Sequence, residues 1–257
     1  MKENSVLAEV IKTSKSLTLL TLETAGSILR GRFSFQEVVR QCYYIGNKSL
    51  FFVMGSLAFV GMVAVIQAGV QSQKLLGSFN FQEIGAVFLQ LMIRESGPTI
   101  AALMLATRVG AGIAAEVGAM KVTEQIEALR MNEADPVDYI VSPRVIASGL
   151  MMIVVTTYCI LLAEVAGGLT ASARFGGNFL SFFSMSRIES ADMIMGFWKA
   201  IWYGISIPIV ASEAGLGASG GSAGVGDATT RAVVACSLVI VVEDFIVSVF
   251  GYVFLLG

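Results

Sequence analysis

The sequence predicts an all-α integral membrane protein, in which N-terminal amphipathic interfacial helices precede five transmembrane helices. The first reason is composition: 55% of the 257 residues are hydrophobic and 14% are charged, whereas soluble domains carry roughly 25% charged residues. The second is five apolar stretches, each close to the ~20 residues that a spanning helix needs. We expect a cytoplasmic, interfacial segment over residues 1–48 and a transmembrane domain over residues 49–257.

The first 48 residues have the pattern of helices that lie on a membrane surface. Apolar residues recur there at roughly helical spacing, with Lys12 and Lys15 between them, which is typical of an amphipathic interfacial helix. Ser34 and Glu37 have the spacing of a capping box, so we expect a second helix after them, with Tyr44 at the level of the membrane interface. The alternative is one irregular soluble tail.

The five predicted spans cover residues 51–70, 84–106, 145–163, 188–212 and 232–256. Lys and Arg residues gather before the first span, whereas the first loop carries Lys74 only. Because cytoplasmic loops are enriched in these cations, we expect the N-terminus in the cytoplasm. With five spans, the C-terminus then emerges on the other side.

Arg94 and Glu95 lie inside the second predicted span, where a charge costs about 2.5–3.5 kcal/mol on insertion scales. They lie about ten residues, or ~15 Å, from the outer start of that span, which is deep for the short Glu95 side chain. We therefore expect these charges to border a cavity or to have partners; the alternative is that both reach the interface. Adjacent helical residues point about 100° apart, so one is expected to face the cavity and the other a neighbouring helix.

The loop between the second and third spans contains a predicted short amphipathic helix, residues 124–130. Its apolar face holds Ile126 and Leu129, and its polar residues are Glu124, Gln125, Glu127 and Arg130. Asp135 and Pro136 then have the pattern of a new helix start. From the residues alone, this short helix is either a surface connector or a docking helix that fits a groove on a cytoplasmic partner.

Two glycine-containing stretches have structural explanations. Gly110, Ala114 and Gly118 place small residues on one helix face, which favours close packing within the chain, with a homodimer seam as the alternative. The glycine-rich stretch over residues 215–226 follows a span rather than a strand, and Asp227 stands where a P-loop has lysine. A tight turn into the fifth span is therefore expected there, and not a nucleotide-binding loop.

Several function classes are excluded by composition. The chain has no histidine, which excludes histidine zinc sites and Ser-His-Asp triads. Its three cysteines are far apart and are expected to be buried thiols. The net charge of −2 and the absence of a basic run argue against a nucleic-acid partner.

A combination of short motifs resembles the MlaE/YrbE-type permeases. They are RESGP at residues 94–98, AEVG at 115–118, MKVTEQIEAL at 120–129, Asp135-Pro136, Pro143-Arg144 and GVGDATTRAVV at 224–234. The resemblance runs from about Glu37 to the C-terminus. It implies a homodimeric inner-membrane permease with a cytoplasmic ABC ATPase on each half, a periplasmic MCE-domain partner and often a small STAS-domain protein. It also implies phospholipid movement between inner and outer membranes.

The resemblance assigns roles to the residues singled out above. Residues 124–130 would be the coupling helix to the ATPase, and Arg94 and Glu95 would border the lipid cavity, with Arg94 our choice for the phosphate because guanidinium binds it in a bidentate manner. No cofactor is expected on this chain, since ATP and magnesium would lie on the ATPase. Asp227 and Leu216 depart from the family, which often has a basic residue and a nearby tyrosine at these places.

Two other functions remain as alternatives to an ABC lipid permease. One is an ion-coupled transporter that acts alone and uses the intramembrane charges as relay groups. Those charges are Arg94, Glu95, Glu164, Glu243 and Asp244. The other is a membrane scaffold that anchors a lipid carrier without transporting lipid.

Overall fold

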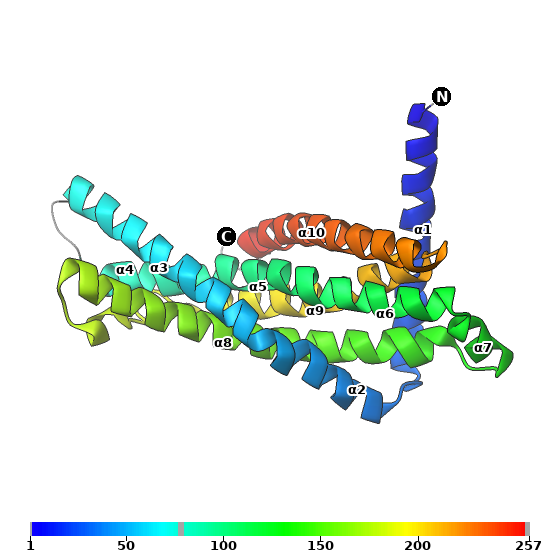
Figure 1. Ribbon diagram of the computed structural model, residues 1–257. Helices are drawn as coiled ribbons and strands as arrows, with labels where there is room; N and C mark the ends of the chain where they lie inside the picture. The colour runs from blue at the N-terminus through cyan, green and yellow to red at the C-terminus, as the bar shows by residue number, and fades with distance from the viewer. Residues whose placement is uncertain (1, 77–79, 255–257) are drawn as a thin grey trace. The chain divides into compact units, whose positions relative to one another are not determined.

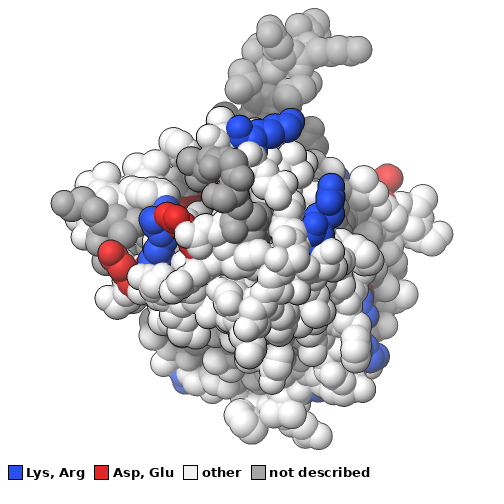
Figure 2. Space-filling view, turned by 90° about the vertical axis from the view of Figure 1, so that its left-hand side faces the viewer, with Lys and Arg blue, Asp and Glu red and all other residues white. Residues whose placement is uncertain are grey.

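A computed structural model describes residues 2–76 and 80–254, and the side chains of residues 13–75 and 80–254. Every regular element in these ranges is helical and none is a strand. Five helical stretches are long and apolar enough to cross a membrane: Phe35–Leu75, Phe81–Val122, Val137–Phe175, Ser190–Leu216 and Gly221–Phe254. Uncharged side chains dominate the face of the protein shown in Figure 2. The predicted fold class is confirmed.

The N-terminal part contains α1 (Lys2–Leu29), α2 (Phe35–Cys42), the π-helical segment η1 (Tyr43–Asn47) and α3 (Lys48–Leu76). The second span is built from α4 (Phe81–Leu91), η2 (Met92–Ser96), α5 (Gly97–Leu105), η3 (Ala106–Gly110) and α6 (Ala111–Val122), with η2 and η3 in π geometry. Asn80 caps α4, because its side chain accepts a hydrogen bond from the Glu83 backbone N–H at 3.3 Å.

The remaining elements begin with the short helix α7 (Gln125–Met131), which follows α6 (Figure 1). They continue with η4 (Val137–Val141), α8 (Ser142–Phe175), the 3-10 turn η5 (Phe179–Phe182), α9 (Ser190–Leu216) and α10 (Gly221–Phe254). Asp135 caps the start of η4, since its carboxylate accepts from the Val137 N–H at 2.9 Å. The helix start that Asp135 and Pro136 predict is confirmed.

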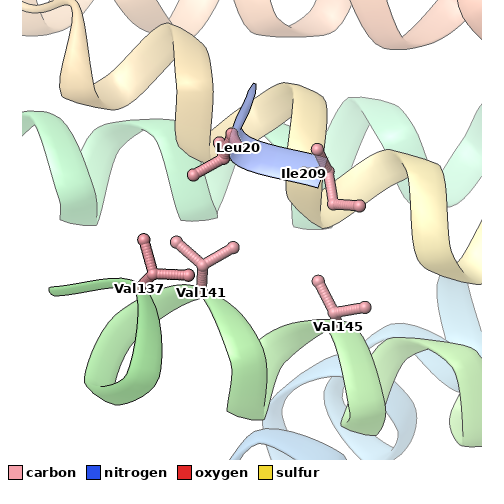
Figure 3. Close-up of a cluster of buried hydrophobic side chains, with 5 residues drawn as sticks. All are labelled: Leu20, Val137, Val141, Val145 and Ile209. Atoms are coloured by element: carbon pink, nitrogen blue, oxygen red, sulfur yellow. The ribbon is translucent and has the colours of Figure 1, made fainter. Parts of the chain in front are cut away.

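The chain divides into two compact units. The first unit comprises Met1–Ile45, Ala106–Leu150 and Gly204–Val239, and the second comprises Gly46–Leu105, Met151–Tyr203 and Ile240–Gly257. A core cluster of the first unit joins α1, η4, α8 and α9 (Figure 3). Its members are Leu20, Val137, Val141, Val145 and Ile209. Leu20 of α1 therefore packs against the protein itself, whereas Leu19, Leu22 and Leu29 on the same helix are exposed.

The second unit packs its helices closely through small residues. A side chain on Gly61 of α3 would meet the carbonyl oxygen of Ala163 on α8 at 2.9 Å. Val53, Leu57 and Val65 on the same helix are fully buried. Because no atom larger than hydrogen fits at Gly61, this glycine sets the distance between α3 and α8.

Two details at the start of the first span differ from the sequence-based expectation. The backbone is helical without a break from α2 through η1 into α3, so the expected second interfacial helix is the first part of the spanning helix. Ser34 does occupy the N-cap position, but its side chain makes no capping hydrogen bond, and Glu37 instead pairs with Arg40 at 3.3 Å. The division of the chain at residue 48 stays a prediction.

The glycine-rich stretch forms a shorter turn than expected. α9 ends at Leu216 and α10 begins at Gly221, so the helix starts well before residue 232. Gly220 and Gly221 have φ values of +87° and +71°, a conformation that glycine adopts readily. A tight turn is confirmed, and the helix that follows it is longer than the apolar residues alone indicate.

The small-residue stripe packs within the first unit. A side chain on Gly118 would lie 3.3 Å from the Ala218 Cβ, and one on Gly110 would lie 3.4 Å from the Cys236 sulfur. Both neighbours belong to the segment formed by α9, the glycine turn and α10. The preferred interpretation, packing within the chain, is confirmed for these two glycines.

Candidate functional site

Arg94 and Glu95 both lie in η2, within the second unit. In an α-helix the backbone N–H of residue 98 would donate to the Arg94 carbonyl, but Pro98 has no N–H. The Gly97 N–H donates to the Met92 carbonyl, five residues back. Pro98 therefore favours a wider helical turn at the two charges, and such π-turns are frequent at functional sites.

Lys199 of α9 is the centre of a polar cluster in the second unit, here called the Lys199 cluster. Its side chain is fully buried, with 0% exposure. The ammonium group pairs with the Glu95 carboxylate and donates hydrogen bonds to Asp244 Oδ1 at 2.8 Å and Ser248 Oγ at 2.7 Å. Asp244 and Ser248 both lie on α10, so η2, α9 and α10 are joined by one cation.

Asp244 also receives hydrogen bonds from two neutral groups, which complete the Lys199 cluster. The Tyr203 hydroxyl and the Thr99 hydroxyl each donate to Asp244 Oδ1 at 2.8 Å. Hydrogen bonds to the charged form of a carboxylate stabilise that form. Asp244 is therefore held by a cation and by two hydroxyl groups.

Arg94 has its own partners on the same two helices. Its Nη1 lies 3.4 Å from Asp192 Oδ1, and its Nη2 donates to the Tyr252 hydroxyl at 2.7 Å. The guanidinium carbon lies 4.9 Å from the centre of the Tyr252 ring, a cation–π distance. Asp192 is fully buried and also accepts from Gln90 and from the Glu189 backbone, each at 3.0 Å.

These groups leave some hydrogen-bonding capacity unused. The two cations, Arg94 and Lys199, face three carboxylates, which belong to Glu95, Asp192 and Asp244. These five side chains therefore carry one net negative charge when all of them are ionised. Arg94 Nε and Glu95 Oε1 are buried without a hydrogen-bond partner. Across the described ranges, no His, Cys, Asp and Glu residues form a group suited to a metal ion.

The sequence-based expectation of partners for Arg94 and Glu95 is confirmed. The two side chains meet residues seven positions apart on α9, Asp192 and Lys199. The structure differs on one point, because both face neighbouring helices. That either residue borders a lipid cavity stays a prediction.

Sequence reasoning missed the roles of Asp192, Lys199, Tyr203 and Tyr252. A signal was available for Lys199, which is a cation inside an apolar span, while Glu243 and Asp244 are acids inside another. Charges inside spans usually pair with one another, so opposite charges in different spans can be matched before a structure is known. Nothing comparable in the sequence marks the two tyrosines.

The predicted coupling helix corresponds to α7 (Gln125–Met131) in the first unit. Ile126 is only 1% exposed, so it packs against the protein and cannot contact a cytoplasmic partner. Met131 is 80% exposed, and Glu124, Gln125 and Arg130 are also exposed. Of the predicted apolar face, Leu129 alone is partly exposed. A docking surface on α7 would therefore be formed mainly by its polar residues and Met131.

The ends of α7 are set by two unusual backbone conformations. Glu124 and Glu133 have φ values of +59° and +58°, a left-handed conformation that is uncommon outside glycine. Lys121, in the last turn of α6, pairs with Glu127 of α7. This pair holds α7 against the end of α6.

The ion pair between Lys121 and Glu127 predicts that the stability of the permease depends on pH. The hydrogen bond from Lys121, and then the backbone hydrogen bond of Glu127 itself, lower the pKa of Glu127 from its ordinary value near 4.5. A lowered carboxylate pKa gives stability that is complete above the unfolded pKa and is lost as the pH falls through the folded pKa. The stability difference between wild type and Glu127→Gln should therefore be present at pH 7 and shrink as the pH falls through the lowered pKa of Glu127. Thermal unfolding at pH 7 and at successively lower pH measures it, and a difference that does not shrink would contradict the prediction.

Comparison with known proteins decides the family. Residues 38–250 match the family described as Permease MlaE. This chain belongs to the MlaE permease family. Relatives agree with that assignment: a probable ABC transporter permease protein of Synechocystis sp. is 34% identical over 223 residues, which cover 86% of this chain and 84% of the relative.

Two further relatives carry more specific names. The intermembrane phospholipid transport system permease protein MlaE of Haemophilus influenzae is 33% identical over 84% of this chain and 83% of its own length. The chloroplastic protein TRIGALACTOSYLDIACYLGLYCEROL 1 of Arabidopsis thaliana is 32% identical over 92% of this chain and 67% of its own length. This MlaE-family protein is thus a multi-pass ABC transporter permease, a subunit without catalytic activity that works with an ATPase.

Proposed function

We propose that this permease moves phospholipid between the inner and outer membranes, driven by an ATPase subunit and together with a periplasmic MCE-domain partner. The relative named as an intermembrane phospholipid transport permease carries the proposal, because the match extends over most of both chains. The Lys199 cluster and Arg94 support it, since charges inside a span usually mark a substrate pathway. ATP and magnesium would bind to the ATPase.

The proposed assembly is a homodimer in the inner membrane, in some cases with a STAS-domain protein. An unusually exposed α10 supports a second copy of the chain. In the most apolar 18-residue stretch of α10, only 11% is buried within the chain. Large side chains of this helix, such as Leu238, Phe245 and Val249, are exposed. Part of this surface would contact lipid and part the second subunit.

The function is tested by purifying the permease with its partners and measuring phospholipid transfer from reconstituted vesicles. We expect the ATPase, an MCE-domain protein and bound phospholipid to copurify, as identified by mass spectrometry. Transfer should require ATP hydrolysis and should continue when an ionophore collapses ion gradients. Transfer that stops with the ionophore but not with an inactive ATPase would instead indicate an ion-coupled transporter, and a purified complex without bound lipid would favour a scaffold.

Docking of the ATPase on α7 gives a specific expectation. Met131→Asp places a charge on the exposed end of α7. Burying a methionine side chain in an interface contributes about 1.5–3 kcal/mol, and the variant would lose that contribution. The ATPase should therefore be retained less well in a pull-down, while the permease still inserts and dimerises. Met185→Asp is a matched control, because Met185 is 75% exposed but lies in the second unit. Equal ATPase retention by both variants would contradict docking at α7.

The proposed topology places α1 in the cytoplasm. Lys15 is exposed on α1, whereas the side chain of Lys12 lies outside the described side chains. Lys15→Cys should react with a membrane-impermeant maleimide in inverted vesicles and remain unlabelled in intact cells whose outer membrane has been permeabilised. Labelling in the intact cells would invert the topology.

A further inference from the structure

A pocket in the second unit contains a buried carboxyl group that lies outside the charged network described above. The pocket has a volume of about 400 Å³, within the ~300–1,000 Å³ of small-molecule sites. Its walls come from α4, η2, α5, α8, α9 and the segment between η5 and α9. They are almost entirely apolar and include Leu89, Ile93, Ile160, Phe183 and Phe197.

Glu164 of α8 brings a carboxyl group into this lining. The residue is 3% exposed, and both of its carboxyl oxygens are buried without a hydrogen-bond partner. Thr156, two turns earlier on α8, lines the same pocket, and its hydroxyl is likewise buried and unpartnered. The pocket thus offers an unused carboxyl and an unused hydroxyl within an apolar wall.

The side chains that the structure describes supply no cation for Glu164. Lys199 is occupied by Glu95 and Asp244, and Arg94 is occupied by Asp192. No ion pair found among the described side chains includes Glu164. An unpaired carboxylate in a low-dielectric environment is strongly unfavourable, so a ligand that brings a cation or donor would be stabilised there.

We propose that this pocket binds an amphiphile with an alkyl chain and a primary ammonium group, and that Glu164 pairs with the ammonium. A hydroxyl head group would donate to one oxygen of the Glu164 carboxylate but would not neutralise its negative charge. An ammonium group has three donors and neutralises that charge. The alkyl chain would lie along Ile160, Ile93 and Phe197. Such a ligand could be an aminophospholipid of the membrane or a free long-chain amine, and the proposal holds whether or not this permease transports phospholipid.

Photolabelling tests the proposal on the full-length protein in phosphatidylcholine nanodiscs. A photoactivatable long-chain primary amine should label peptides of α8 and α9 that line the pocket. Dodecylamine should compete, and dodecanol of the same chain length should not. Glu164→Gln and Glu164→Leu should each reduce labelling about tenfold or more, as expected for loss of a charged hydrogen bond. Glu189→Gln, an exposed site in the same unit, should leave it unchanged.

Two further measurements keep the test decisive. Without ligand, Glu164→Leu should be at least as thermally stable as wild type, because an apolar residue of similar size replaces an unpaired polar group. Replacing part of the phosphatidylcholine by phosphatidylethanolamine tests the source of the amine. Reduced labelling would identify an aminophospholipid of the membrane as the ligand. Unchanged labelling, with competition by dodecylamine alone, would identify a free amphiphile. Full labelling of both Glu164 variants, equal competition by dodecanol, or strong destabilisation by Glu164→Leu would overturn the proposal.

Discussion

Replacing Lys199 by alanine is expected to lower the free energy of unfolding by about 3–5 kcal/mol, the usual effect of removing one partner from a buried ion pair. Lys199 is fully buried, and its ammonium is the cation for both Glu95 and Asp244. Without it, Glu95 and Asp244 lose their cation and the Ser248 hydroxyl loses a donor. Denaturant unfolding of the purified permease in micelles measures the difference.

A matched control is available in the same unit. Lys74 lies near the end of α3 and is exposed, so Lys74→Ala should change stability by no more than about 0.5 kcal/mol. Lys199→Ala combined with Asp244→Ala should recover part of the loss, because fewer unpaired carboxylates remain. Equal stability of the Lys199 and Lys74 variants would show that the cluster contributes nothing to folding.

Arg94→Glu is expected to impair transport and also to destabilise the permease. The new carboxylate would face the fully buried Asp192 and would lose the hydrogen bond to Tyr252. Breaking such a buried pair costs about 3–5 kcal/mol, so the effect on transport must be separated from the effect on folding. Outer-membrane barrier function in a complemented deletion strain, measured as detergent sensitivity, reports transport, and complex yield reports folding.

The charge swap separates the two effects. Arg94→Asp together with Asp192→Arg keeps an ion pair between η2 and α9 but moves the cation away from η2. If Arg94 itself guides the lipid, the double variant should regain yield without regaining barrier function. Full recovery of both would limit Arg94 to a structural role, and full complementation by Arg94→Glu alone would remove it from the lipid path.

Much of the fold follows from hydropathy, because a membrane restricts spanning segments to long apolar helices. The ends of the helices were harder to predict. The helix of α10 includes Gly221–Arg231, where glycine and threonine disfavour a helix by up to about 1 kcal/mol per residue. Two local contacts in this stretch are invisible in the sequence: Ala228 is fully buried, and a side chain on Gly224 would collide with the Ser219 carbonyl oxygen at 1.7 Å.

The candidate site was predictable in part. Arg94 and Glu95 are recognisable because charges in an apolar span need partners. The partner of Arg94 is not, since Asp192 lies next to a loop in the sequence and resembles an ordinary helix-capping residue. Ile126 was assigned to an outward face because amphipathic spacing identifies an apolar side without showing what covers it. Its burial shows that the protein itself covers it.

The π-turn at Met92–Ser96 makes the number of residues in this stretch part of the site. A π-turn holds one residue more than an α-turn, so deleting Ile93 would allow the segment to return to α geometry. The helices before and after the deletion would then keep their orientation relative to each other, because the wider turn had absorbed the extra residue. Gln90 and Arg94 would remain on nearly the same face, toward Asp192. A single-residue gap here would thus be tolerated better than a gap in a regular α-helix, which rotates the flanking parts by about 100° relative to each other.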